Sequence, residues 1–338
     1  MLHIMLKRLL YNENCIEGAR KLIKDGTVDL IITDPPYGIN ADTFEKHYNR
    51  KESNVIDGYV EIPKEKYEEF SNNWIREAER ILRPGGSIYI ISGYTNLYYV
   101  LAALRNTSLK MINHIIWKYN FGVHTTKKYV SSHYHILYLV KPGGKVTFNT
   151  FCRYGENERD DNGGSLNYRD REDVWVINKE YKPNQKKNRN ELPTNLLIKM
   201  MQYSSNEGDL VCDLFLGGFS TARVAIGLRR KVTGFEISEN IFRNGIAALE
   251  NVKPGYLLEK IRKPDNSNFY NRGKPWTEEE KMRVKIRYAN LLSGGKSSKE
   301  SIDSLSSELG RGHFSISKIL KSEKDSFAVR INNKRELT

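Results

Sequence analysis

A short hydrophobic run at residues 30–32 (Leu-Ile-Ile) stops abruptly at Asp34, Pro35, Pro36 and Tyr37. The β-branched run predicts a buried strand, and the two prolines end it because they lack backbone N–H donors. Asp34 is therefore expected at the carboxyl end of a strand, the edge at which open α/β sheets bind ligands. A carboxylate there, followed by a stiff turn and an aromatic ring, suits a flat ligand that carries an amino group.

Strand-like and helix-like segments alternate along most of the chain. Strands are predicted at 28–32, 87–91, 114–118, 133–141, 208–215 and 231–238, and helices at 64–82, 96–104, 192–205 and 219–230. This order predicts an α/β fold. A length of 338 residues allows one large domain plus a smaller one.

Composition narrows the class of partner. The formal net charge is +13, from 54 Lys+Arg against 41 Asp+Glu, and such an excess attracts nucleic acid or an anionic membrane surface. A solvated basic surface typical of an AT-rich genome is the alternative.

No apolar run approaches the ~18 residues of a membrane span, and the apolar segment at residues 1–6 is too short for a signal sequence. The three cysteines are scattered without C-x-x-C, which favours a reducing cytoplasm and neither a zinc site nor disulfides.

Residues 211–225 (VCDLFLGGFSTARVA) predict a strand, a glycine turn and a helix, the usual geometry for placing a ligand against backbone amides. The turn is not G-x-G-x-x-G, so a dinucleotide fingerprint is not indicated. A second strand ends at Glu236 about 20 residues further on, where an acid commonly receives ribose hydroxyls. Taken alone, Asp213 is also explained as a helix-capping residue and Glu236 as a surface acid.

Together with Asp-Pro-Pro-Tyr, these blocks resemble the amino-methylating DNA methyltransferases that use S-adenosylmethionine. The order is that of the permuted class, in which Asp-Pro-Pro-Tyr precedes the cofactor turn. The resemblance covers roughly residues 8–250, through the blocks at 12–22, 28–38, 80–90, 133–141, 192–215 and 234–238. It implies a Rossmann-like methyltransferase fold with a mixed, mostly parallel sheet.

The resemblance also implies a mechanism and a set of site residues, with no metal. Asp34 and the Pro35 carbonyl would accept hydrogen bonds from the exocyclic amine of a flipped base, within a catalytic motif completed by Pro36 and Tyr37. Holding both protons localises the nitrogen lone pair for attack on the sulfonium methyl, and Tyr37 would stack on the base. The implied cofactor-binding residues are Asn14, Cys15, Asp34, Asp213, Phe215, Gly217, Gly218, Ser220, Thr221 and Glu236.

Three departures from the family pattern stand out. Phe219 replaces a motif glycine, with Gly218 beside it as compensation, and is expected to reshape the methionine pocket. Leu192-Pro193 replaces a lysine-proline pair. Asn14 replaces an acid, which is expected to weaken a contact to the cofactor's adenosine.

Several basic segments are candidates for binding DNA. The polar stretch 145–192 predicts a target-recognition insert, with Lys186, Lys187 and Arg189 in it, or a disordered loop. Lys127 and Lys128 are expected to contact phosphate. His133 and His135 share a strand face near the base pocket and read as ordinary strand histidines, since a metal site needs further ligands.

The C-terminal tail resembles a helix-turn-helix. A small residue (Ser306), a glycine (Gly310) and an apolar residue (Ile316) have the usual offsets. Any three-helix packing unit would show the same spacing. The basic residues assigned to DNA in this tail are Arg311, Lys318 and Lys321.

The sequence thus predicts a methyltransferase domain at 1–250, a linker at 251–274 and a small helical domain at 275–338. The expected activity is site-specific methylation of adenine N6 in double-stranded DNA, within a restriction–modification system or as an orphan enzyme. In the family resemblance, Asp at the first motif position goes mostly with adenine and Ser with cytosine. The expected partner protein is a cognate restriction endonuclease, with the chain a monomer or homodimer and no membrane association.

The alternatives are a cytosine N4 DNA methyltransferase, a methylase of RNA or protein, and a non-catalytic DNA-binding regulator with a methylase fold. Carbon-5 methylation is not expected, because it needs a cysteine conventionally placed after a proline. Cys15, Cys152 and Cys212 follow Asn, Phe and Val.

Overall fold

The computed structural model describes residues 9–36, 62–120, 126–180, 191–265, 271 and 274–321. Tyr37, Lys186, Lys187 and Arg189, which the sequence singled out, lie outside these ranges. The chain divides into two compact units. The larger contains residues 1–152 and 171–262, and the smaller contains 153–170 and 263–338.

The larger unit is built on an eight-stranded sheet with the order β1-β8-β7-β2-β3-β5-β4-β6. Only β5 runs antiparallel to its neighbours among these described strands, so the predicted mixed, mostly parallel sheet is confirmed. The strands are β1 (Leu10–Tyr11), β2 (Val28–Thr33), β3 (Leu82–Ser92), β4 (Lys110–Lys118), β5 (His133–Val140), β6 (Val174–Val176), β7 (Leu210–Asp213) and β8 (Lys231–Phe235).

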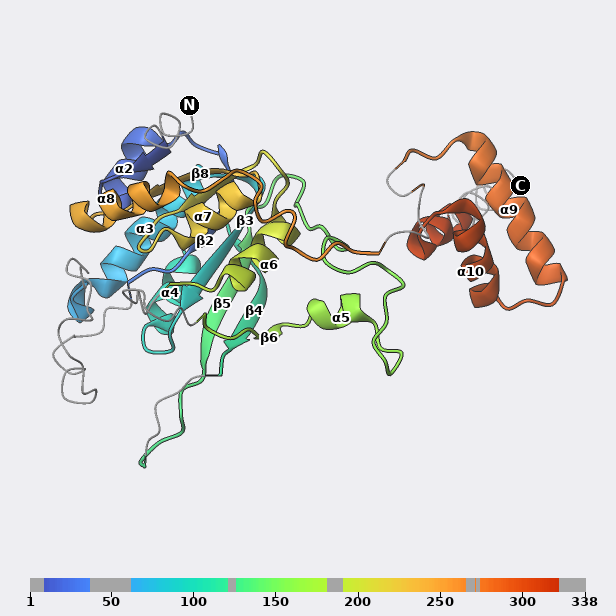
Figure 1. Cartoon of the computed structure of the whole chain (residues 1–338), viewed down its shortest axis with the longest axis horizontal. Helices are drawn as coiled ribbons and strands as arrows, with labels where there is room; N and C mark the ends of the chain where they lie inside the picture. Colours follow the sequence, from blue (N-terminus) through green and yellow to red (C-terminus); the bar gives the residue numbers. More distant parts are fainter. Residues whose placement is uncertain are drawn as a thin grey trace, which may run out of the picture. The chain divides into compact units, whose positions relative to one another are not determined.

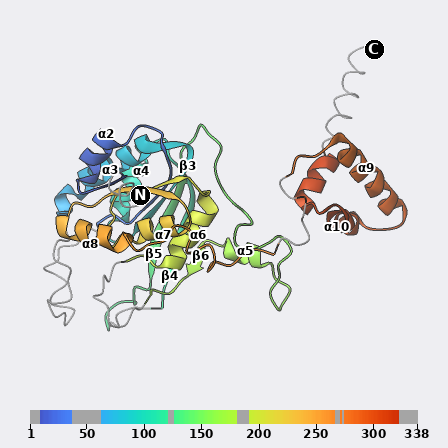
Figure 2. The same cartoon turned by 45° about the horizontal axis from the view of Figure 1, so that its top comes forward.

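Helices cover both faces of the sheet (Figures 1 and 2). One face carries α2 (Cys15–Leu22), α3 (Tyr67–Ile81, after the short helix η3, Lys64–Lys66) and α4 (Leu97–Leu104). The other carries α6 (Thr194–Ser204), α7 (Ser220–Gly227) and α8 (Glu239–Leu249). Leu30 and Ile32 pack on the second face, and Ile31 packs on the first. This two-sided burial is the reason why the run at residues 30–32 is continuously apolar.

The smaller unit contains α5 (Leu166–Asp170), α9 (Glu278–Ser293) and α10 (Ser298–Leu309), and residues 313–321 are also helical. The helix α9 starts with a capping box at Thr277 and Glu280, and α10 starts with another at Ser297 and Glu300. The helices after residue 274 close over a small apolar core of Val284, Leu305, Leu309 and Ile316.

The segment 153–170, which the sequence assigned to the insert 145–192, belongs to this smaller unit. Its contacts are polar: the Glu158 carboxylate accepts from the backbone N–H groups of Gly155 (2.9 Å) and Asp265 (2.5 Å). His313 lies 3.3 Å from Glu156. Polar contacts of this kind do not require a periodic pattern of apolar residues, so they could not be predicted from the sequence. The target-recognition role of 145–192 and the domain limits at 250 and 275 remain predictions.

The described helices include none with the length and apolar character needed to span a membrane.

Candidate active site

Three carboxylates lie at neighbouring strand ends. β8, β7 and β2 are adjacent and parallel, so their carboxyl ends meet at one edge of the sheet. Glu236 follows β8, Asp213 ends β7 and Asp34 follows β2. Parallel neighbours thus bring together residues that the chain separates by about 200 positions, at the edge where open sheets bind ligands.

The side chain of Asp213, at the end of β7, is buried and forms hydrogen bonds to β2 and to the turn that follows β7. Its Oδ1 accepts hydrogen bonds from the backbone N–H of Phe215 (3.0 Å) and the hydroxyl of Thr33 (3.3 Å). Burial raises the pKa of Asp213 to about 7, against the lowering effect of the Thr221 hydroxyl and these donors, and the charge of Asp34 raises it further. Asp213 is therefore neither an exposed acid nor a simple helix cap.

The glycine turn takes a conformation that the sequence did not anticipate. Gly217 and Phe219 have positive φ angles of 47° and 58°, whereas Gly218 is not among the residues with positive φ. The expectation that Gly218 compensates for Phe219 is therefore wrong. Phe219 adopts the left-handed backbone itself, although its Cβ makes that conformation costly.

The Phe219 ring is directed into the packing between α7 and α8. It is 1% exposed and lies edge-on to Phe242, with ring centroids 5.9 Å apart. A Cβ on Gly245 would lie only 2.2 Å from this ring, so Gly245 provides the space that Phe219 fills. The substitution is accommodated by the helix layer, which is not where the sequence analysis expected its effect.

Glu236 is fixed against the glycine turn. Its Oε2 accepts from the backbone N–H of Gly217 (3.0 Å) and its Oε1 from that of Ser238 (2.8 Å). Burial raises its pKa. A carboxylate oriented in this way at the end of the second strand fits the position that receives ribose hydroxyls in nucleotide-binding sheets.

The first residues of α2 lie close to the same carboxylates. Burial raises the pKa of the Cys15 thiol to about 12, and the charges of Asp213 and Glu236 also raise it, which places Cys15 near both acids. Asn14 caps α2, because its Oδ1 accepts from the backbone N–H groups of Ile16 (2.9 Å) and Glu17 (3.3 Å). The structure thus gathers most of the predicted cofactor residues at one edge of the sheet.

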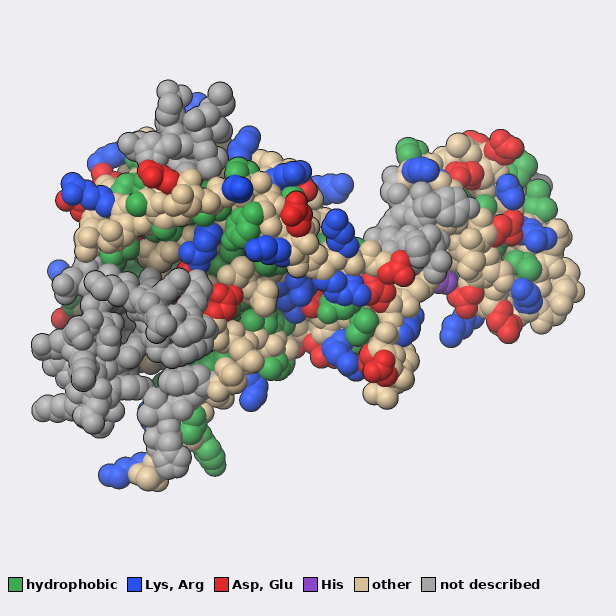
Figure 3. All heavy atoms as spheres, in the orientation of Figure 1, with side chains coloured by type: hydrophobic (Ala, Val, Ile, Leu, Met, Phe, Trp, Pro, Cys, Tyr) green, Lys and Arg blue, Asp and Glu red, His purple; other side chains and the backbone are tan. Residues whose placement is uncertain are grey.

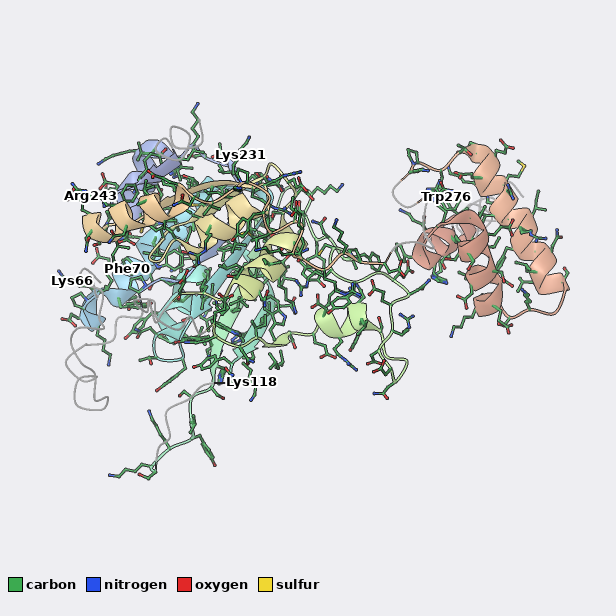
Figure 4. All side chains as sticks on the ribbon, viewed as in Figure 1. Lys66, Phe70, Lys118, Lys231, Arg243 and Trp276 are labelled. Atoms are coloured by element: carbon green, nitrogen blue, oxygen red, sulfur yellow. The ribbon has the colours of Figure 1, made fainter. Side chains whose placement is uncertain are left out.

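The turn after Asp34 is held by a residue that the sequence analysis missed. The hydroxyl of Tyr67, a fully buried residue at the start of α3, donates to the carbonyl oxygen of Pro36 at 2.9 Å. Phe70, one turn later on α3 (Figure 4), lies 5.8 Å from the ring of Phe215 in the glycine turn. Helix α3 therefore contacts both loops of the site. Tyr67 lies about 30 residues beyond the motif, and no local pattern links the two.

The strand histidines form a pair and not a metal centre in the described part of the chain. His114 Nε2 lies 2.8 Å from His135 Nδ1, and the rings of His133 and His135 are 5.1 Å apart. Burial lowers the pKa of His135, and the charges of His114 and His133 lower it further.

The basic residues assigned to DNA differ in their exposure. Lys127, Lys128, Lys318 and Lys321 are exposed. On the face of the smaller unit seen in Figure 3, basic side chains are mixed with acidic ones. Contact with DNA by the exposed lysines remains a prediction.

The assignment of Arg311 to DNA is wrong. Arg311 is only 3% exposed, and its guanidinium donates to the carbonyls of Asn271 and Pro275 and to the carboxylate of Glu280. It also lies over the ring of Trp276, 4.4 Å from the centroid. Because these groups occupy the guanidinium, Arg311 has a structural function inside the smaller unit.

Comparison with known proteins points to one family. A family model described as DNA methylase matches residues 28–248. M.HpaI, a Type II methyltransferase from Haemophilus parainfluenzae, is 30% identical, with 73% of this chain and 77% of that protein covered. The DNA adenine methyltransferase YhdJ from Escherichia coli K12 is also 30% identical, with 75% and 87% covered. The Type II methyltransferase M.BamHI from Bacillus amyloliquefaciens is 32% identical over 78% of this chain, which matches only 62% of M.BamHI.

Solved structures support the fold. TTHA0409 from Thermus thermophilus, complexed with S-adenosyl-L-methionine, superposes with a TM-score of 0.52 at 19% identity, with 76% of this chain and 97% of that chain covered. The PvuII cytosine-N4-specific DNA methyltransferase gives 0.51 at 13% identity, with 74% and 89% covered. At these identities the likeness concerns the fold.

Proposed function

This chain belongs to the DNA methylase family, and from that membership we propose that it transfers a methyl group from S-adenosylmethionine to adenine N6 in double-stranded DNA. The name of YhdJ as a DNA adenine methyltransferase supports adenine as the target. Cytosine N4 is the second candidate, because the amine chemistry is the same and the PvuII enzyme shares the fold.

One observation carries the proposal. Asp34 lies at the end of β2, the strand next to β7, and its charge acts on Asp213 at the start of the glycine turn. A hydrogen-bond acceptor and a nucleotide-type turn thus share one edge of the sheet. A protein that only binds DNA has no need of this juxtaposition.

The chemistry assigned to Asp34 is that of an oriented acceptor. An exocyclic amine is a poor nucleophile because its lone pair is delocalised into the ring. The Asp34 carboxylate and the Pro35 carbonyl would each accept one amine N–H, which localises the lone pair toward the incoming methyl group. Tyr67 fixes the turn through Pro36, so the acceptors are oriented before the base arrives.

The residues present fit the cofactor. S-adenosylmethionine supplies an electrophilic methyl group on a sulfonium. Glu236, held against the glycine turn, would accept hydrogen bonds from ribose hydroxyls, and the backbone of residues 217–221 would contact the methionine part. Asn14 and Cys15 would line the same site from the start of α2.

Nucleoside analysis tests the target. DNA methylated by the purified chain is digested to nucleosides and separated by mass spectrometry, and we expect N6-methyladenine. N4-methylcytosine without N6-methyladenine would establish the second candidate, and no methylated nucleoside would contradict the activity.

The smaller unit is the proposed accessory contact to DNA. On the helix 313–321, Phe314, Lys318 and Lys321 follow i, i+4, i+7 spacing, which places them on one side, and all three are exposed.

The Type II names of M.BamHI and M.HpaI support a second proposal, that a cognate restriction endonuclease accompanies this methylase.

A further inference from the structure

A half-buried lysine lies over a cluster of aromatic rings in the sheet. Lys179 Nζ is 4.8 Å from the ring centroid of Tyr119, 4.9 Å from that of Tyr134 and 6.0 Å from that of Trp117. The three rings contact one another at centroid distances of 5.4 to 5.8 Å. A cation over aromatic faces is attracted by the ring quadrupoles, so the position of the ammonium group is defined.

The backbone on both sides of Lys179 is also fixed. Two residues before it, Ile177 donates to the carbonyl of Lys118 (3.0 Å) and accepts from Trp117 Nε1 (2.8 Å). Lys118, labelled in Figure 4, ends β4. One residue after it, the Glu180 carboxylate accepts from the backbone N–H of Thr194 (2.7 Å) at the start of α6. Lys179 is therefore held between two anchors and is not a freely moving surface lysine.

The rings that seat Lys179 lie at the same edge of the sheet as Asp34. The strand β3 runs parallel to β2, and its last residue, Ser92, pairs with His135 of the antiparallel β5, next to Tyr134. Burial lowers the pKa of Lys179, and the charge of Asp34 acts in the opposite direction. Asp34 also interacts with Asp213, whose own ionisation is opposed by burial and by Asp34. The charge of Asp34 is therefore disfavoured by the carboxyl group of Asp213 and favoured by the ammonium group of Lys179, and the Tyr67 hydroxyl binds the same turn.

We propose that Lys179 is a positioning residue for catalysis: its ammonium group, seated on Tyr119 and Tyr134, keeps Asp34 an ionised acceptor for the target amine. The inference rests on the proposed function and adds a residue to it. A protonated Asp34 carries an O–H donor where the amine needs an acceptor. Near a second carboxyl group a proton tends to be retained, and the cation of Lys179 opposes this.

The test compares charge-removing and charge-keeping variants of the full chain. Lys179→Met and Lys179→Gln remove the cation, whereas Lys179→Arg keeps it in a form that also stacks on aromatic rings. Lys199→Met is the matched control, because Lys199 is another cation over an aromatic ring of the same unit, 4.4 Å from the ring centroid of Trp175. Methyl transfer from labelled S-adenosylmethionine to unmethylated phage DNA is measured from pH 5 to 9, with cofactor binding measured by calorimetry.

We expect both neutral variants to move the acid limb of the rate profile up by about one pH unit, so that kcat falls by up to about tenfold on that limb and changes little above it. Lys179→Arg should restore the wild-type acid limb, and cofactor binding should stay unchanged in all variants. Acid limbs in Lys179→Met and Lys179→Gln that coincide with the wild-type limb would overturn the role of Lys179 alone. No transfer by the wild type would overturn the proposed function and this inference with it.

Discussion

The two compact units differ in where their charged side chains lie and what those side chains bind. In the larger unit, helices on both faces bury the sheet, and charged groups such as Asp34 and Glu236 follow strand ends, where we propose that they form a site. In the smaller unit the core has few large apolar residues, and the buried Arg311 connects Asn271 and Pro275 to Glu280. A basic residue in a basic tail is therefore not a nucleic-acid contact by default, and its burial decides which function it has.

The largest expected effect tests the larger unit. Asp34→Ala should reduce methyl transfer by about 10³-fold or more, because it removes the acceptor for the amine. Cofactor binding should fall far less, because Asp34 is one of ten residues assigned to the cofactor. Asp34→Asn keeps one carbonyl acceptor and should retain more activity than Asp34→Ala. Radiolabel transfer beside calorimetric binding measures both. Substantial activity in Asp34→Ala would contradict the mechanism.

The corresponding change in the smaller unit should act on stability. Arg311→Ala should cost about 3–5 kcal/mol within this unit, because it removes the buried cation that binds Glu280 and leaves several carbonyls without their donor. Arg283→Ala is the matched control: Arg283 is 65% exposed, at 3.3 Å from Glu308, and an exposed pair contributes only about 0–1 kcal/mol. Hydrogen exchange of the α9 and α10 amides measures the loss. Equal protection in the two variants would show that burial of Arg311 is not decisive.

A buried acid of the larger unit should make stability depend on pH. The pKa of Asp213 is about 7 in the folded chain and about 4 when unfolded, so the folded state binds more protons between these values. Its contribution to stability is present below pH 4 and is lost as the pH rises to about 7. Asp213→Asn should flatten this decline, by an amount on the order of 2–4 kcal/mol. Urea unfolding of both proteins from pH 4 to 8 measures it, and parallel curves would contradict the assignment.

The smallest expected effect concerns the exposed lysines of the smaller unit. Changing Lys318 and Lys321 together to Ala should leave stability unchanged and reduce the slope of log affinity against log salt by about 0.9 for each lost phosphate contact. Lys296 and Lys299, also exposed in this unit, serve as a control pair. Titrations with duplex DNA at several salt concentrations provide the slopes. Equal slopes for the two double variants would argue against the helix 313–321 as the contact.

The sequence predicted those parts of the site that local patterns encode. Apolar runs followed by an acid located Asp34, Asp213 and Glu236 at strand ends, because strand and turn chemistry extend over only a few residues. Tyr67 and Lys179 were missed because their importance depends on strand order and on contacts between segments distant in the chain. Arg311 was misassigned for a related reason: the carbonyls that surround it come from a segment about 40 residues earlier, whose placement no charge pattern reveals.

The close contact between Phe219 and Gly245 makes the substitutions tolerated at these two positions interdependent. While an aromatic ring fills the space between α7 and α8, position 245 accepts no side chain, because even a methyl group would overlap that ring. If position 219 were glycine, a larger residue at 245 would fill the vacated volume. The order of changes then matters, since replacing Gly245 first crowds the ring and replacing Phe219 first leaves a cavity. Each residue sets which substitutions the other can tolerate, across two helices that the chain numbers 26 positions apart.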